Sequence, residues 1–77
     1  MIMKISVIIG DWAKRYIKPD LLEFDLPEQV TVADVLEMLP LPPEETGLTA
    51  IDGKAANRDY LLSEGDQMKI YPSIVNG

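Results

Sequence analysis

The sequence predicts a single α+β domain in which one short helix covers one face of a small sheet. Apolar and polar residues alternate in two segments near the N-terminus and in one near the C-terminus, which is the period of half-buried strands. A segment with helical periodicity lies between them. A chain of 77 residues has room for one core, and in this arrangement every element has one buried face and one wet face.

The first two predicted strands form a hairpin. In residues 1–9 the apolar side chains of one parity are Met1, Met3, Ile5, Val7 and Ile9. In residues 21–26 the inward positions are Leu22, Phe24 and Leu26. Residues 11–20 then form a loop with room for one helical turn, on which Trp12 and Tyr16 would share a side and cover the end of the core. A binding role for these two aromatic residues is the alternative.

A helix is expected to begin at Val32. Thr31 followed by Asp34 is the pattern of a capping box, in which each residue satisfies a backbone N–H of the other. Pro40 ends the helix after about two turns because it has no N–H to donate. The expected apolar stripe, which faces the hairpin, consists of Val32, Val35, Leu36 and Leu39.

The second half of the sequence predicts three more strands and a short apolar segment that plugs the core. Residues 48–51 and 54–56 are strands joined by Asp52-Gly53, a pair that tolerates the positive φ angles of a type I′ turn. The apolar side chains of residues 60–62 are expected to fill the core beneath the last turn. Residues 67–71 alternate as a final strand.

Pro72 ends that final strand because proline has no backbone N–H to donate to a neighbouring strand. We therefore assign residues 1–72 to the domain and residues 73–77 to a flexible C-terminal tail. Because the tail finishes on Gly77, it presents an unhindered carboxylate. A frayed terminus without function is the other explanation.

Composition excludes several classes of function. The sequence has no cysteine and no histidine, so it has no disulfide, no thiolate metal site and no histidine base. The net charge of −6 disfavours binding to nucleic acid or anionic membranes and favours a basic protein partner. The apolar N-terminal segment is too short to span a bilayer and lacks the features of a secretory signal. We expect a cytoplasmic protein.

The order of elements is strand, strand, helix, strand, short strand, strand. This is the order of a ubiquitin-like β-grasp, with a mixed four- to five-stranded sheet and one main helix packed on one face. The opposite face is where a partner could bind, and it is expected to carry no unusually large apolar patch. Its predicted polar residues are Lys4, Ser6, Glu23, Asp25, Lys69 and Tyr71.

Two stretches of the chain carry a family resemblance. Residues 51–72 combine an Asp-Gly turn, a short strand, an apolar residue leading into a Gly-Asp turn, and a strand that ends in proline. Together with the helix start at residues 30–36, this run resembles the ubiquitin-like sulfur carriers ThiS and MoaD. The family's tail ends in Gly-Gly, whereas this sequence ends in Asn76-Gly77.

The resemblance implies a carrier and not an enzyme. In that family, a ThiF- or MoeB-like enzyme uses ATP and Mg²⁺ to adenylate the terminal carboxylate, and a sulfur donor then converts it to a thiocarboxylate. A ThiG-like or MoaE-like synthase subunit receives the sulfur for thiamine or for molybdopterin or tungstopterin synthesis. The chain itself is expected to bind no cofactor or metal.

Carried over to this sequence, the resemblance makes Gly77 the covalent carrier site. Ile74, Val75 and Asn76 become the part of the tail that threads into the activating enzyme, while Tyr71 and Pro72 help to dock it. Two alternatives remain open. One is a ubiquitin-like modifier that passes Gly77 to a lysine amine, and the other is a β-grasp interaction module whose tail is inert.

Overall fold

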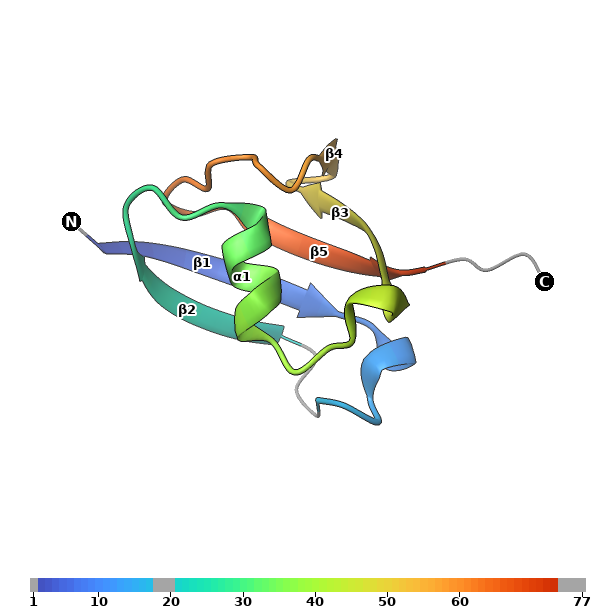
Figure 1. The fold of residues 1–77 in the computed structure, drawn as a ribbon. Helices are drawn as coiled ribbons and strands as arrows, with labels where there is room; N and C mark the ends of the chain where they lie inside the picture. The colour runs from blue at the N-terminus through green and yellow to red at the C-terminus, as the bar shows by residue number, and fades with distance from the viewer. Residues whose placement is uncertain (1, 18–20, 74–77) are drawn as a thin grey trace.

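A computed structural model describes residues 2–17 and 21–73 and confirms the predicted β-grasp (Figure 1). The strands are β1 (Ile2–Ile9), β2 (Leu21–Pro27), β3 (Thr46–Ile51), β4 (Lys54–Ala56) and β5 (Gln67–Pro72). The helix is α1 (Val32–Met38), and two 3₁₀ turns are η1 (Asp11–Ala13) and η2 (Pro43–Glu45). All five strands join one sheet in the order β2-β1-β5-β3-β4, in which only β1 and β5 are parallel.

The core lies between α1 and the face of the sheet that it crosses (Figure 1). The antiparallel register of the first hairpin pairs Ile5 with Phe24, so the described inward positions of β1 and β2 are those that the alternation predicts. Met1, which was also predicted to face inward, lies outside the described residues. The largest fully buried side chains come from β1, β5 and α1 and are Ile5, Ile9, Met68, Ile70, Val7, Val32 and Val35. Trp12 and Tyr16 pack against one end of this cluster, as expected.

The capping box at the start of α1 is present as predicted. The Thr31 hydroxyl accepts a hydrogen bond from the Asp34 N–H at 3.2 Å, and the Asp34 carboxylate accepts one from the Thr31 N–H at 2.9 Å. The helix ends at Met38, two residues before Pro40. The Asp52-Gly53 turn also forms, with φ angles of 51° and 87°.

Replacing Thr31 with alanine should lower the free energy of unfolding by about 1 kcal/mol, because the Asp34 N–H loses its partner. Urea denaturation followed by circular dichroism measures the change. Thr31→Ser keeps the hydroxyl and should retain most of the stability. Equal urea midpoints for the alanine variant and the wild type would show that the cap contributes nothing.

The predicted plug at residues 60–62 was wrong for two of its three side chains. Leu62 is buried at 4 % exposure, but Tyr60 is 40 % exposed and Leu61 57 %. The backbone explains the difference, because this segment runs beside the chain that enters α1. The Leu62 N–H donates to the Val30 carbonyl, and the Val32 N–H donates to the Tyr60 carbonyl. These bonds hold the segment extended, so only Leu62 points inward.

Candidate functional site

The candidate site lies at the C-terminal end of β5. This strand occupies the middle of the sheet, between β1 and β3. The two predicted docking residues, Tyr71 and Pro72, are its last residues. The other predicted site residues lie outside the described part of the chain, so their roles stay predictions: they are Ile74, Val75, Asn76 and Gly77.

The end of β5 is held closely by the start of β3. Thr46 pairs with Pro72, and further along Thr49 pairs with Ile70, so β3 has one more residue than β5 in this interval. The irregularity contains Gly47, where an added Cβ would lie 2.6 Å from the Pro72 carbonyl oxygen and 3.0 Å from the Ser73 Cα. Only glycine allows this approach without moving the backbone. Beyond it, the Ser73 N–H donates to the Glu45 carbonyl at 2.9 Å.

The sequence predicted strand β3 from residue 48, two residues later than it begins. The missed part contains the contacts of Gly47 with β5. A lone glycine next to a strand pattern is the signal that could have indicated this close approach.

The sheet face opposite α1 carries exposed apolar side chains beside its predicted polar residues. Tyr71, 39 % exposed, lies on this face, and the Lys69 ammonium is 5.2 Å from the centre of its ring. Leu48, which lies within the β3 irregularity, is 55 % exposed, and so is Leu21 on β2. Leu21 shares the parity of Glu23 and Asp25, so the alternation alone could have placed it there. We call Leu21, Leu48, Lys69 and Tyr71 the outer patch.

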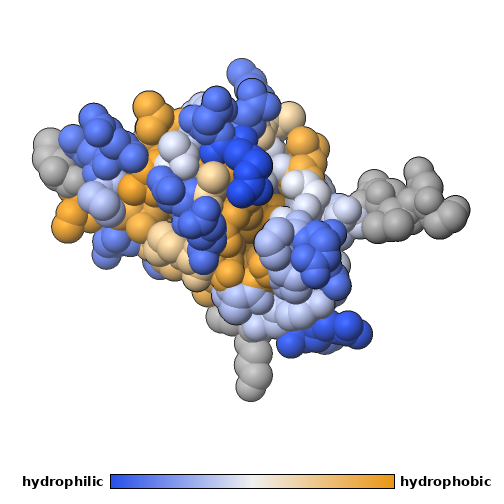
Figure 2. Space-filling model, in the orientation of Figure 1, coloured by the Kyte–Doolittle hydropathy of each residue, from blue (hydrophilic) through white to orange (hydrophobic). Residues whose placement is uncertain are grey.

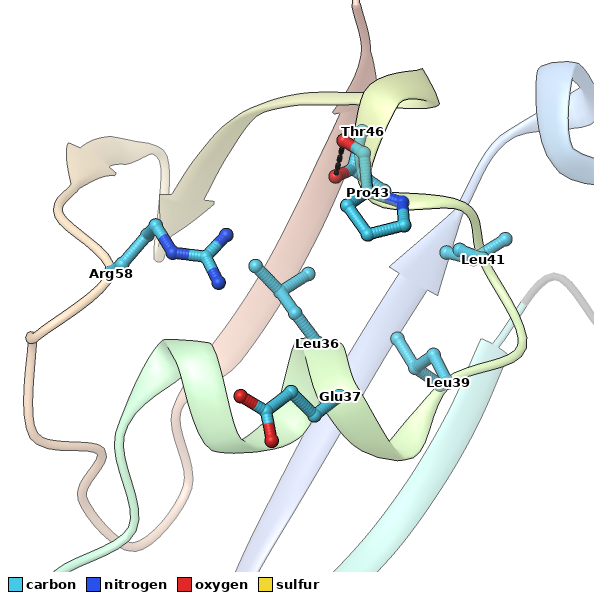
Figure 3. A pocket seen from close by; sticks show the side chains of 7 residues that line it. All are labelled: Leu36, Glu37, Leu39, Leu41, Pro43, Thr46 and Arg58. Atoms are coloured by element: carbon cyan, nitrogen blue, oxygen red, sulfur yellow. Dashed lines mark hydrogen bonds between the residues drawn. The ribbon is translucent and has the colours of Figure 1, made fainter.

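The face that carries α1 has a pocket of about 440 Å³ (Figure 3). Its lining residues come from α1, the segment that follows it, η2, β3 and the loop after β4: Leu36, Glu37, Leu39, Leu41, Pro43, Thr46 and Arg58. The Arg58 guanidinium reaches over Leu36, while the Thr46 hydroxyl donates to the Pro43 carbonyl at 3.0 Å. Figure 2 shows hydrophilic and hydrophobic residues interspersed on this face. This pocket was not predicted from the sequence.

Within residues 2–17 and 21–73, no three acidic side chains converge as metal ligands would. In the same part of the chain, no helix is long and apolar enough to cross a membrane.

Comparisons with known proteins agree with the fold. A putative molybdopterin converting factor, subunit 1, from Pyrococcus furiosus has a TM-score of 0.78 at 21 % identity, over 94 % of this chain and 99 % of that one. The small archaeal modifier protein 1 of H. volcanii has a TM-score of 0.77 at 14 % identity, over 94 % and 99 %. The ubiquitin of Caldiarchaeum subterraneum has a TM-score of 0.66 at 22 % identity, over 100 % of both chains.

At these identities the solved structures establish a ubiquitin-like β-grasp and nothing finer. No protein with curated annotation matches the sequence significantly. The sequence model of one family, Mut7-C ubiquitin, matches residues 12–76, which is well over half of the chain. This chain is therefore a ubiquitin-like β-grasp protein that belongs to the Mut7-C ubiquitin family.

Proposed function

We propose that this protein is a sulfur carrier whose Gly77 carboxylate is adenylated by a partner enzyme and converted to a thiocarboxylate. The observation that carries the proposal is the end of β5. The central strand β5, paired on both sides, ends at one end of the domain (Figure 1), and Gly77 follows five residues after its last residue, Pro72. A terminal glycine on such a strand can be delivered into another protein's active site while the domain stays folded.

The chemistry needs no catalytic side chain from this protein. A carboxylate oxygen of Gly77 attacks the α-phosphorus of ATP, and pyrophosphate leaves. A sulfur nucleophile at the oxidation level of hydrosulfide then adds to the acyl carbon, and AMP leaves. The partner enzyme binds ATP and Mg²⁺, while the carrier supplies the acyl group. A glycine suits this position because it has no Cβ to collide with a narrow channel.

The outer patch is the surface that we assign to docking of a ThiF- or MoeB-like activating enzyme. It combines an aromatic ring with two exposed leucines, and aromatic and apolar side chains form the centres of protein interfaces. Glu23 and Asp25 lie on the same face of β2, beside this patch. These two carboxylates and the protein's net charge of −6 favour a partner with basic residues at the rim of its interface. A ThiG-like or MoaE-like sulfur acceptor would use the same exit at Pro72.

A ubiquitin-like modifier is the second candidate. It is favoured by the likeness to the small archaeal modifier protein 1 and to the ubiquitin of Caldiarchaeum subterraneum. This function uses the same activated Gly77 but passes the acyl group to a lysine amine, with loss of AMP or of a thiol. A β-grasp interaction module would use the outer patch alone.

Intact-mass spectrometry tests the proposal. The protein is incubated with the ThiF- or MoeB-like enzyme of its own organism, ATP, Mg²⁺ and sulfide, beside an established sulfur carrier with its own enzyme. We expect an ATP-dependent mass gain that corresponds to replacement of one oxygen by sulfur. An unchanged mass beside a charged control contradicts the proposal. Peptides with Gly77 linked to lysine would support the modifier instead, and partner binding that survives removal of residues 76–77 would support the module.

A further inference from the structure

We infer that Trp12, Tyr16 and Glu45 are positioning residues that fix the direction in which the chain leaves the domain at Ser73. We call these three residues the collar. The inference rests on the sulfur-carrier function proposed above and concerns one step of it, the delivery of Gly77 into the activating enzyme. The collar consists of two residues in the segment after β1 and one in η2.

Direction matters because the proposed function places the reacting carboxylate only a few residues beyond Ser73. The carboxylate of Gly77 is four residues along the chain from Ser73. A fully extended chain spans at most about 3.5 Å per residue, so the carboxylate can reach no further than about 14 Å from Ser73. A long linker could bring the carboxylate to a distant active site from any starting direction, whereas a reach of about 14 Å confines it to the neighbourhood of Ser73. The orientation of the chain at Ser73 therefore decides whether Gly77 meets ATP.

Trp12 supports β5 where β1 stops. The parallel pairing of the two strands ends at Ile9 and Ile70, because the chain leaves β1 at Gly10 and enters η1. The Trp12 indole N–H then donates to the Ile70 carbonyl at 3.3 Å. A backbone carbonyl that would otherwise need water is thus satisfied by a side chain from the turn that follows β1. This contact extends the support of β5 beyond its ladder with β1.

Glu45 accepts two hydrogen bonds, one from the residue that follows β5 and one from the segment that follows β1. Its backbone carbonyl accepts the hydrogen bond from the Ser73 N–H at 2.9 Å, and its carboxylate accepts one from the Tyr16 hydroxyl, also at 2.9 Å. Tyr16 and Trp12 belong to the same segment. The contacts therefore close a ring, from Trp12 to Ile70, along β5 to Ser73, across to Glu45, and back through Tyr16.

A purely structural role explains this ring less well. The bond between Tyr16 and Glu45 lies at the surface, where a hydrogen bond adds little to the stability of the whole domain. Its place is nevertheless specific, because it joins residues 29 positions apart at the base of the tail. Ordering this base before binding reduces the entropy that is lost when the tail enters a channel.

Two variants break the ring without disturbing the core. Tyr16→Phe removes only the hydroxyl, and Glu45→Ala removes the carboxylate. For each variant, ATP–pyrophosphate exchange with the activating enzyme gives KM for the carrier and kcat. Hydrogen exchange of the Ser73 amide reports on the base of the tail independently of any enzyme. Thermal unfolding verifies that the fold is intact.

We expect both variants to raise KM about two- to tenfold, with kcat unchanged, and to speed exchange at Ser73. The double variant should resemble either single one, since both remove the same bond. Glu45→Gln keeps an oxygen that accepts from Tyr16 and should restore a KM near that of the wild type. The matched control is Tyr60→Phe, which removes the hydroxyl of an exposed tyrosine outside the collar and the outer patch.

The inference is overturned if Tyr16→Phe and Glu45→Ala leave KM at the wild-type value, or if Tyr60→Phe raises it equally. In either case the wild type is still activated, so the proposed function stands. If the wild type itself is not activated, the sulfur-carrier proposal fails and the role of the collar falls with it.

Discussion

Replacing Gly77 with valine is expected to slow adenylation by about 100-fold or more. A β-branched side chain at the reacting residue widens the tail and limits its backbone angles, so the carboxylate cannot take the position that attack on ATP requires. Misplacement of a reacting group by about 1 Å costs about 100-fold in rate. ATP–pyrophosphate exchange at saturating ATP measures the loss.

Asn76→Gly is the matched variant, with the opposite expected result. It recreates the Gly-Gly ending of the carriers that the sequence resembles and removes the one side chain that departs from their pattern. We expect kcat/KM for activation to increase. If Gly77→Val reacts as fast as the wild type, the tail does not enter a narrow channel, and the assignment of Gly77 as the carrier site is wrong.

Replacing Gly47 with alanine is expected to lower the free energy of unfolding by about 1–3 kcal/mol. The new Cβ would lie 2.6 Å from the Pro72 carbonyl oxygen and 3.0 Å from the Pro72 carbonyl carbon. These are backbone atoms that cannot rotate aside, so β3 and the end of β5 must separate. Urea denaturation measures the stability, and the amide chemical shift of Ser73 reports the displacement.

Gly53→Ala is the control for this prediction. It adds the same methyl group at a site where no atom lies within 4 Å, although its φ of 87° carries a conformational cost of its own. Both variants should therefore lose stability, but only Gly47→Ala should shift the Ser73 resonance and slow activation. An unchanged Ser73 resonance in Gly47→Ala would show that the close approach does not position the base of the tail.

Local patterns in the sequence predicted most of the fold. The alternation of apolar and polar residues predicted β1, β2 and β5, because every second side chain of each strand faces the core and the others face water. Thr31 and Asp34 marked the start of α1 through a bond pattern that spans only three residues. The Asp52-Gly53 turn was equally local. Each of these features depends on neighbours in the sequence, which a single chain reveals.

The features that the sequence did not reveal depend on residues far apart. The irregularity at Gly47 exists because β3 meets Pro72, and the support from Trp12 exists because η1 lies beside Ile70. The exposure of Tyr60 and Leu61 follows from pairing with the segment that enters α1. None of these partners can be identified from periodicity alone. The predicted roles of residues 74–77 concern a part of the chain outside the structural description.

The central position of β5 has a mechanical consequence. A pull along the tail, such as a partner would exert while drawing Gly77 inward, runs parallel to the strand. Its ladders with β1 and β3 consist of hydrogen bonds that lie across this direction, so they resist the pull together and do not open one after another. An edge strand would resist the same pull with one ladder, whereas β5 has two, so the domain should remain folded while its tail is drawn into a partner.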